Sequence, residues 1–290
     1  MRNEIILKFD GSLSPNKNVA LRTLAYTLPH LQRAIDKSVY FHERHDLRKY
    51  TSLPDELQPL AALYIHEVQI GSFKIPFISE LLKGVPELFT EFMAQPYAQA
   101  ANDVKLVKGI LKVDLGVAKG HAQLDNLEER TQEDMIKDEQ GRKIAFARSA
   151  VLHDVNTMLS VVRGDQAAFI SLDTDTERYG YRNFEFNQER AVRFNRITNT
   201  KRLADAVVYT GKIKGVEEQK ARSQFRYSAK FLSSTTGQES KLLIADLEDA
   251  QRINAHNLKD VEVQFWGAPI ALYEAFDPVR GDVVFIDFTY

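Results

Sequence analysis

The sequence contains no cysteine, and this absence excludes several kinds of chemistry. Without a thiol, the chain has no disulfide, no thiolate zinc site, no iron–sulfur cluster and no cysteine nucleophile. Disulfides are rare in a reducing cytoplasm, so the lack of cysteine is consistent with that compartment. We expect a cytoplasmic protein, because the N-terminus also shows no secretion signal.

Long apolar runs and a strong excess of one charge are missing too. No stretch reaches the roughly 18 apolar residues of a transmembrane helix, which predicts a soluble protein without a membrane partner. The 290 residues carry a formal net charge of -2, so a nucleic-acid interface requires a local cluster of basic residues. A hydrophobic content of 44% is sufficient for packed cores.

The motifs of several common enzyme classes are absent. The chain has no G-x-x-x-x-G-K-[ST], no G-x-G-x-x-G, no G-x-S-x-G and no H-E-x-x-H. Nucleotide hydrolases, dinucleotide enzymes, serine hydrolases and zincins therefore lose support, and we predict no cofactor and no resident metal. Whether the chain is an enzyme stays open, and we favour a non-enzymatic role.

Hydrophobic periodicity predicts an α+β fold whose N-terminal domain covers residues 1–163. Alternating residues indicate strands, and apolar residues at helical spacing indicate long helices. A Gly-Ser pair between two strand-like runs favours a tight hairpin turn. The expected elements are a strand over 4–10, a helix over about 16–48, a hairpin turning at Gly71 and Ser72, and helices over 79–118 and 142–162.

The C-terminal domain, residues 164–290, is predicted to be a small β-barrel. Three strand-like runs, one short helix and two more strand-like runs follow one another, which is the order of an OB-like barrel. Other small barrels and sandwiches share parts of this order. The expected strands cover 207–216, 223–232, 241–246, 261–266 and 283–288, and the helix covers 247–256.

Basic residues alternate with aromatic residues on the second strand of this barrel. Arg226 and Lys230 face one way, and Lys212 and Lys214 on the preceding strand extend that face into a basic strip. On an OB-like barrel, such a strip is where single-stranded nucleic acid lies. The alternative is a solvated outer face, since the aromatic rings alternate inward.

A second candidate interface lies upstream, where arginines are interleaved with aromatic rings. Guanidinium groups pair with phosphates and stack on bases, so Arg178, Tyr179, Tyr181 and Arg182 are candidate nucleic-acid-binding residues. The alternative is that the tyrosines are core positions of one more hairpin, with the arginines at its rim.

Histidines three positions apart on a predicted helix are the first catalytic candidates. His42 and His45 share nearly one helix face, and Asp46 could join them as a metal ligand. Boundary histidines satisfied by hydrogen bonds explain the pair as well.

An Arg-x4-His pattern supplies the second catalytic candidates, Arg148 and His153, and it resembles the ribonuclease motif of HEPN-fold proteins. Five helical positions separate two side chains by about 140° around the axis. The two groups therefore converge only in a distorted helix or across a dimer.

The predicted helix over 79–118 has a strongly apolar face. Its residues include Leu81, Val85, Leu88 and Phe92. Such a face lies either in a core or against a partner, which can be another protein or a second copy of the chain.

Three parts of the chain carry a resemblance to other proteins. They are the opening strand Ile5-Ile6-Leu7-Lys8-Phe9-Asp10-Gly11, the hairpin Ile70-Gly71-Ser72-Phe73 and the C-terminal barrel. Together they resemble a loosely defined group of uncharacterised bacterial proteins, encoded on mobile elements and sometimes beside antiviral defence genes. The resemblance implies a cytoplasmic accessory or sensor role and assigns no catalytic residue.

The sequence therefore predicts a recognition protein. Its ligand is expected to be nucleic acid, single-stranded or RNA by preference, or a protein partner. A metal-dependent or HEPN-like nuclease and a structural subunit of a protein complex stay open as alternatives.

Overall fold

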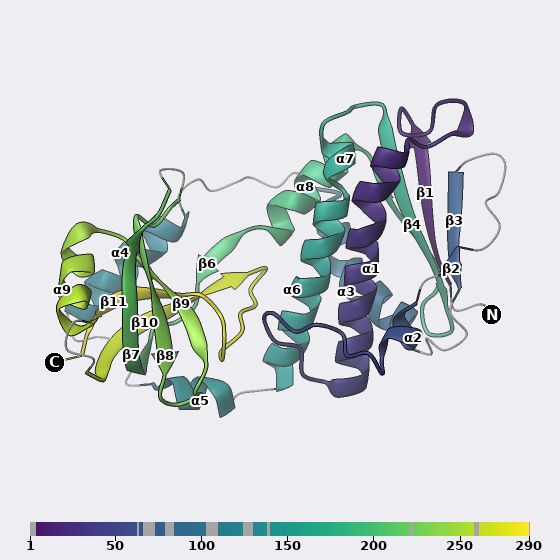
Figure 1. Cartoon of the computed structure of the whole chain (residues 1–290). Coiled ribbons are helices and arrows are strands. Elements are labelled where there is room, and N and C mark those ends of the chain that lie inside the picture. Colours follow the sequence, from purple (N-terminus) through teal and green to yellow (C-terminus); the bar gives the residue numbers. More distant parts are fainter. Residues whose placement is uncertain are drawn as a thin grey trace. The chain divides into compact units, whose positions relative to one another are not determined.

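The computed structural model contains two compact units, each built around a β-sheet (Figure 1). Unit 1 comprises Met1–Leu106 and Ala147–Thr200, and unit 2 comprises Val107–Phe146 and Lys201–Tyr290. Helices and strands occur in both units, which confirms the predicted α+β class. The structure describes residues 4–62, 64–65, 73–78, 84–102, 110–123, 130–137, 140–220, 223–257 and 261–289.

These units differ from the domains expected on either side of residue 164. Residues 164–200 fold with unit 1, because strand β4 (Ala168–Thr176) pairs with the N-terminal strand β1 (Glu4–Gly11) over the whole length of β1. Residues 107–146 belong to unit 2, where Leu111 and Leu115 of helix α4 (Ile110–Gln123) pack on the second sheet. Each unit therefore joins two stretches that are far apart in the sequence.

Unit 1 contains a five-stranded antiparallel sheet in the order β2-β3-β1-β4-β5. The expected hairpin is present as β2 pairing with β3, although its predicted turn at Gly71 and Ser72 lies outside the described residues. The remaining strands are β2 (Tyr64–Ile65), β3 (Phe73–Ile78) and β5 (Gly180–Phe186).

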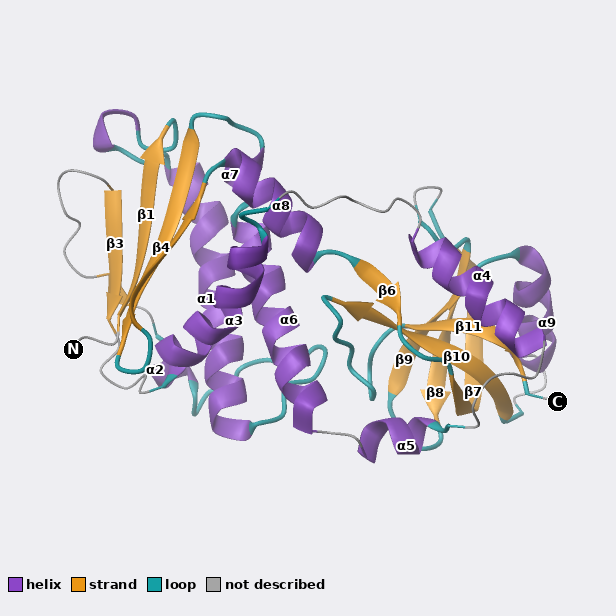
Figure 2. Ribbon diagram, turned by 180° about the vertical axis from the view of Figure 1, so that it is seen from behind, coloured by secondary structure: helices purple, strands orange, loops and turns teal. Residues whose placement is uncertain are grey.

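Helices cover one face of this sheet (Figures 1 and 2). The longest, α1 (Leu21–Arg44), continues through Pro29. Leu7 and Phe9 of β1 are fully buried beneath these helices, so one sheet face forms the core of the unit. The other helical segments are η1 (Pro15–Lys17), α2 (Gln58–Ala61), α3 (Val85–Gln99), α7 (Ser160–Arg163) and α8 (Gln188–Thr198), together with α6 (Gln140–Met158), which belongs to unit 1 from Ala147 onward.

The apolar helix face considered as a docking surface belongs to this core. Val85 and Phe92 of α3 are buried, Leu88 is half-buried, and the ring of Phe92 contacts Phe41 of α1. Leu81 lies outside the described residues. Unit 1 itself therefore covers the described part of that face.

Unit 2 contains a six-stranded sheet in the order β11-β9-β8-β7-β10-β6. An additional pairing of β11 with β10 closes a ring of five strands, in which β9 and β11 are parallel. All five predicted strands and the predicted helix are present. They are β7 (Val207–Glu218), β8 (Tyr227–Ser233), β9 (Glu239–Ile244), α9 (Leu247–Asn257), β10 (Val263–Leu272) and β11 (Val283–Phe288). The short strand β6 (Lys201–Leu203) was not predicted.

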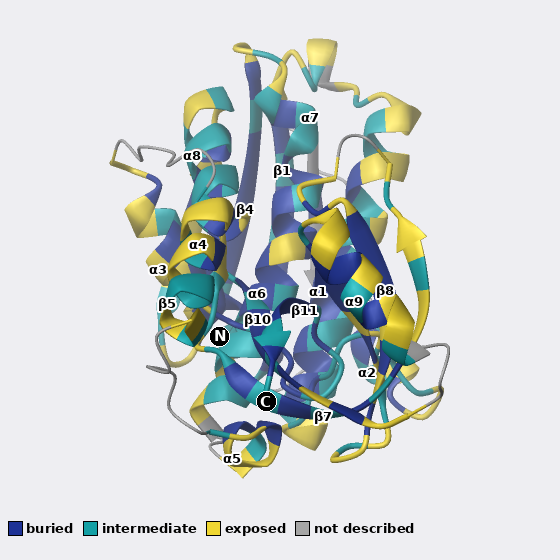
Figure 3. Ribbon diagram, turned by 90° about the vertical axis from the view of Figure 1, so that its left-hand side faces the viewer, coloured by how far each residue is buried: buried dark blue, intermediate teal, exposed yellow. Residues whose placement is uncertain are grey.

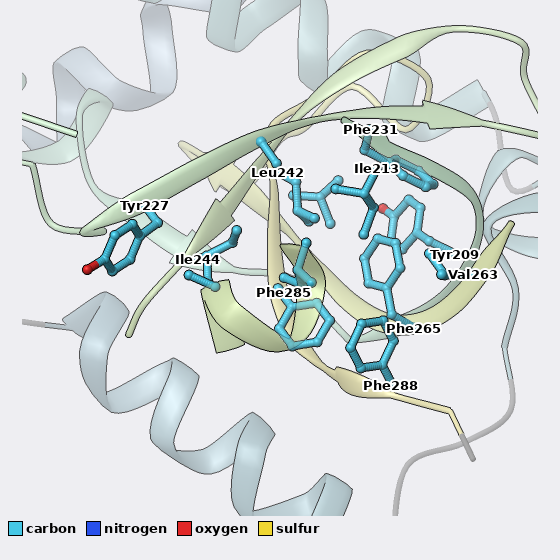
Figure 4. Close-up of a cluster of buried hydrophobic side chains, with 14 of the residues drawn as sticks. Tyr209, Ile213, Tyr227, Phe231, Leu242, Ile244, Val263, Phe265, Phe285 and Phe288 are labelled. Atoms are coloured by element: carbon cyan, nitrogen blue, oxygen red, sulfur yellow. The ribbon is translucent and has the colours of Figure 1, made fainter. Parts of the chain in front are cut away.

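Two apolar clusters stabilise unit 2. Inside the ring, aromatic side chains pack edge to face, with the ring centroids of Phe231 and Phe265 5.1 Å apart (Figure 4). Ala250 and Ile253 of α9 pack on this cluster, which gives α9 one buried side and one exposed side (Figure 3). The second cluster joins the outside of the strands to α4 (Ile110–Gln123), and α5 (Gln132–Lys137) adds Met135 to the first.

None of the described helices combines the length and the apolar character that a crossing of a lipid bilayer requires.

Candidate nucleic-acid interface

Three lysines stand side by side across three neighbouring strands of unit 2. Lys214 of β7 lies opposite Lys230 of β8, and Lys230 lies opposite Lys241 of β9. Residues directly opposite in antiparallel strands have Cβ atoms about 4.5–5.5 Å apart. We call these three residues the lysine row, and all three side chains are exposed.

The alternation of β8 places the row on the outer face of the ring. Ala229 and Phe231 flank Lys230 and are both buried in the interior cluster. Successive side chains of a strand point to opposite faces, so Lys230 points outward and its two cross-strand neighbours share that face. The predicted residues Lys214 and Lys230 are thus brought together, and Lys241 is a member that the sequence analysis missed.

The charges of the row are only partly neutralised. The Nζ atom of Lys230 lies 3.5 Å from Oε1 of Glu239, and both side chains are largely exposed. The Nζ atom of Lys241 donates a hydrogen bond of 3.1 Å to Gln219 Oε1, which is uncharged. In the described part of the chain, no carboxylate pairs with Lys214. Like charges directly opposite each other are destabilising, so a bound anion would reduce the electrostatic repulsion between the three lysines.

The other two predicted residues of the basic strip flank the row. Lys212 is half-buried and lies two residues before Lys214 on β7, opposite Leu232. Arg226 precedes β8, and its Nε atom lies 3.3 Å from Glu218 Oε1 in an exposed ion pair. Both residues add positive charge beside the row, although Glu218 offsets that of Arg226.

The upstream run of arginines and tyrosines belongs to unit 1, around the turn between β4 and β5. The hydroxyl of Tyr179 donates a 3.1 Å hydrogen bond to Glu91 of α3, and the guanidinium of Arg178 lies 3.6 Å from the same carboxylate. Burial and this hydrogen bond raise the pKa of the Tyr179 phenol. These contacts fasten the turn to α3, while Arg182 is exposed on β5.

Tyr181 takes part in a polar cluster around Asp173 on the sheet of unit 1. The carboxylate of Asp173 is buried, and it accepts hydrogen bonds from Tyr181 at 2.8 Å and from Asn183 at 2.6 Å. Lys8 of β1 completes the cluster with an ion pair. Burial and the bond to Asp173 raise the pKa of Tyr181. The cluster joins three strands, and no run of neighbouring residues in the sequence revealed it.

The structure separates the catalytic candidates His42, His45 and Asp46. α1 ends at Arg44, and His45 adopts a left-handed conformation with φ of 52°, so its ring turns back onto Phe41. Asp46 pairs with Arg48 at 2.8 Å, and the ring of His42 lies against Gly84. Among the described residues, no three side chains of His, Asp or Glu form a group that could hold a metal ion.

The Arg-x4-His pair also diverges. Arg148 points toward α3, where its guanidinium lies over the Phe92 ring and donates a 3.3 Å hydrogen bond to Gln95. His153 is exposed on α6. The wide angular separation of positions five apart on a helix accounts for this divergence.

A second polar cluster that the sequence analysis missed joins α1 to α6. The buried carboxylate of Asp154 lies 2.6 Å from Nζ of Lys37, 3.6 Å from Nε of Arg33 and 3.7 Å from Nδ1 of His30. Burial and the neighbouring Arg33 lower the pKa of His30. The spacing of His30, Arg33 and Lys37 on one helix face was the signal that could have indicated it.

A hollow of about 630 Å³ lies in unit 2 beside α4. Val113 and Val117 line it, and its polar end holds the ion pair of Asp114 with Arg202, whose Nε and Nη2 donate at 2.8 and 3.0 Å. Hydrogen bonding to Arg202 lowers the pKa of Asp114. The volume suits a small ligand. The described lining carries both acidic and basic side chains, so it does not favour an anionic ligand over a cationic one.

Comparison of the chain with protein-family models, with curated proteins and with solved structures found no match.

Proposed function

We propose that this protein binds nucleic acid, and that the lysine row of unit 2 holds its phosphate backbone. The observation that carries the proposal is the register that sets Lys214, Lys230 and Lys241 directly opposite one another. Among the described residues, a single weak ion pair offsets the row of like charges, so the row is unfavourable in the free protein. Nucleic acid offers phosphates, which lysine ammonium groups commonly bind.

We also propose that unit 2 is an OB-like barrel. The supporting observations are the strand order, the helix between β9 and β10, and the parallel pairing of β9 with β11 that closes the ring. In such barrels, the face around the second and third strands binds oligonucleotides. The lysine row crosses β8 and β9, which are the second and third strands of the ring.

The experiment is a salt titration of binding by fluorescence anisotropy with a labelled oligonucleotide. Three lysines on B-form DNA correspond to a slope of log K against log salt of about -2.7. Raising the salt from about 50 to about 200 mM then weakens binding about 40-fold. The variant Lys214→Ala/Lys230→Ala/Lys241→Ala is expected to lose most of this slope.

A matched control removes the same charge elsewhere on unit 2. Lys112 of α4, Lys137 of α5 and Lys201 of β6 are exposed and lie outside the lysine row. The variant Lys112→Ala/Lys137→Ala/Lys201→Ala is expected to keep the slope of the unmodified protein. Equal losses in both variants would mean that only the net charge matters, and the proposed interface would be wrong.

The accessory or sensor role that the resemblance implies, with bacterial antiviral defence as one candidate setting, stays a prediction. It concerns the setting in which the protein acts, whereas the lysine row concerns what it binds.

A further inference from the structure

The aromatic rings of the three strands that carry the lysine row all point into the ring of strands. They are Tyr209 of β7 and Tyr227 and Phe231 of β8, while β9 has none. All three are buried members of the interior cluster. Figure 4 shows Tyr209 and Phe231 beside Phe265, and Tyr227 at the margin of the cluster. The ring of Phe225, just before β8, is buried as well. None of these rings is available for stacking on a base.

The described side chains around the lysine row include no aromatic ring, but they do include carboxylates. Glu239 lies opposite Leu232 and pairs with Lys230, and Glu217 lies opposite Ser228. Cross-strand register puts Leu232 opposite Lys212, and Leu243 opposite Ser228. On the described outer face of β7, β8 and β9, the row therefore has charges that attract phosphates and no aromatic platform for an unpaired base.

Single strands and duplexes make different demands on such a surface. Proteins that hold single strands combine a basic groove with aromatic side chains on which the unpaired bases stack. In a duplex, the bases are already stacked on one another. The duplex also offers a higher charge density, one negative charge per about 1.7 Å of helix axis.

The dimensions of the lysine row fit that charge density. Neighbouring strands lie about 4.8 Å apart, so three strands place the outer lysines about 10 Å from each other. A duplex segment of about 10 Å carries roughly six phosphates. Each lysine can therefore reach a phosphate of its own without a sharp bend in the nucleic acid.

We infer that the lysine row takes duplex nucleic acid by its backbone alone, without contacts to the bases. This inference rests on the proposed function and replaces the single-stranded preference expected from the sequence. With three lysines, the slopes for duplex and single strand are about -2.7 and -2.1. If both ligands bind equally at 1 M salt, the duplex binds about fourfold more tightly at 0.1 M.

The test compares a 20-base-pair DNA duplex, one of its strands, and the same strand with its bases removed. We expect the duplex to bind about fourfold more tightly than the strand, and the abasic strand to bind as well as its parent. Tighter binding of the single strand, or a tenfold loss with the abasic strand, would overturn the inference. Absence of binding to every probe would instead refute the proposed function.

A substitution that adds a ring tests the same point from the opposite direction. Leu232 is 41% exposed on the outer face, and Leu247 is 49% exposed on α9. Leu232→Trp is expected to raise single-strand affinity several-fold and to leave duplex affinity unchanged, while Leu247→Trp changes neither. If Leu232→Trp left single-strand affinity unchanged, nucleic acid would not lie along this face, and the inference would be wrong.

Discussion

Replacing Lys230 with glutamine is expected to stabilise the free protein and to weaken its binding of nucleic acid. Lys230 stands between Lys214 and Lys241, so the substitution removes two like-charge contacts at once. Cross-strand charge pairs are worth about 0.2–1 kcal/mol each. The substitution also removes the exposed ion pair with Glu239, and such pairs contribute about 0.2–1 kcal/mol. The expected net gain in unfolding free energy is about 0.5 kcal/mol at low salt.

The assay uses the single tryptophan of the chain. Trp266 lies on β10, so its fluorescence during urea unfolding reports on unit 2. The electrostatic screening length falls from about 10 Å at 0.1 M salt to about 3 Å at 1 M, so the gain should disappear at 1 M salt. Lys112→Gln, on the exposed side of α4, is the control with the same change in charge.

A destabilised Lys230→Gln protein at low salt would refute this reasoning. It would mean that the aliphatic stem of Lys230, or its pair with Glu239, contributes more than repulsion within the row. A gain that persisted unchanged at 1 M salt would also contradict it, since the effect would then not be electrostatic.

Three further predictions follow from single side chains. Glu239→Gln removes the carboxylate beside Lys230, so we expect a few-fold gain in duplex affinity at low salt, measured by fluorescence anisotropy. An unchanged affinity would contradict the proposed binding of nucleic acid by the lysine row. Phe231→Ala removes a fully buried ring that packs against two other aromatic rings. It should lower the unfolding free energy of unit 2 by about 3–5 kcal/mol, measured by urea unfolding with tryptophan fluorescence. A loss below about 1 kcal/mol would contradict the described core. The pKa of His30 is lower in the folded protein than the value of about 6.5 expected in the unfolded chain. Below about pH 6.5 the unfolded chain therefore binds more protons than the folded protein, and the unfolding free energy falls as the pH falls. His30→Gln should therefore flatten the decline in stability below about pH 6.5, measured by circular dichroism, and an unchanged decline would contradict this account.

The strands of unit 2 were predictable because their signal is local. In β8, buried Ala229 and Phe231 flank exposed Lys230, and this alternation is visible in a few consecutive residues. The outward direction of Lys230 follows from the same alternation. Of the three lysines in the row, Lys214 and Lys230 were predicted and Lys241 was not. The position of Lys241 in the row depends on cross-strand register, which sequence periodicity does not contain.

Strand β4 shows why the units of the structure differ from the domains expected from the sequence. Its polar residues include Asp173, which is buried because Lys8, Tyr181 and Asn183 bind it from neighbouring strands. A carboxylate in a short run with other polar residues resembles a loop unless those partners are known. Without β4, the pairing that attaches residues 164–200 to β1 could not be anticipated.

The catalytic candidates are not brought together, for a related reason. The pattern over Phe41 and His42 continues a helix that in fact ends at Arg44, and the left-handed residue His45 redirects the chain there. Helix ends depend on a few local dihedral angles, whereas apolar periodicity defines them only to within a few residues.

The most direct test of the central claim is the salt dependence of duplex binding by the unmodified protein, the lysine-row variant and the matched control. We predict slopes of log K against log salt of about -2.7 for the unmodified protein and the control. The variant that lacks Lys214, Lys230 and Lys241 should show a slope near zero, or no binding. A lysine-row variant that kept the full slope and affinity would contradict the claim that this face holds nucleic acid.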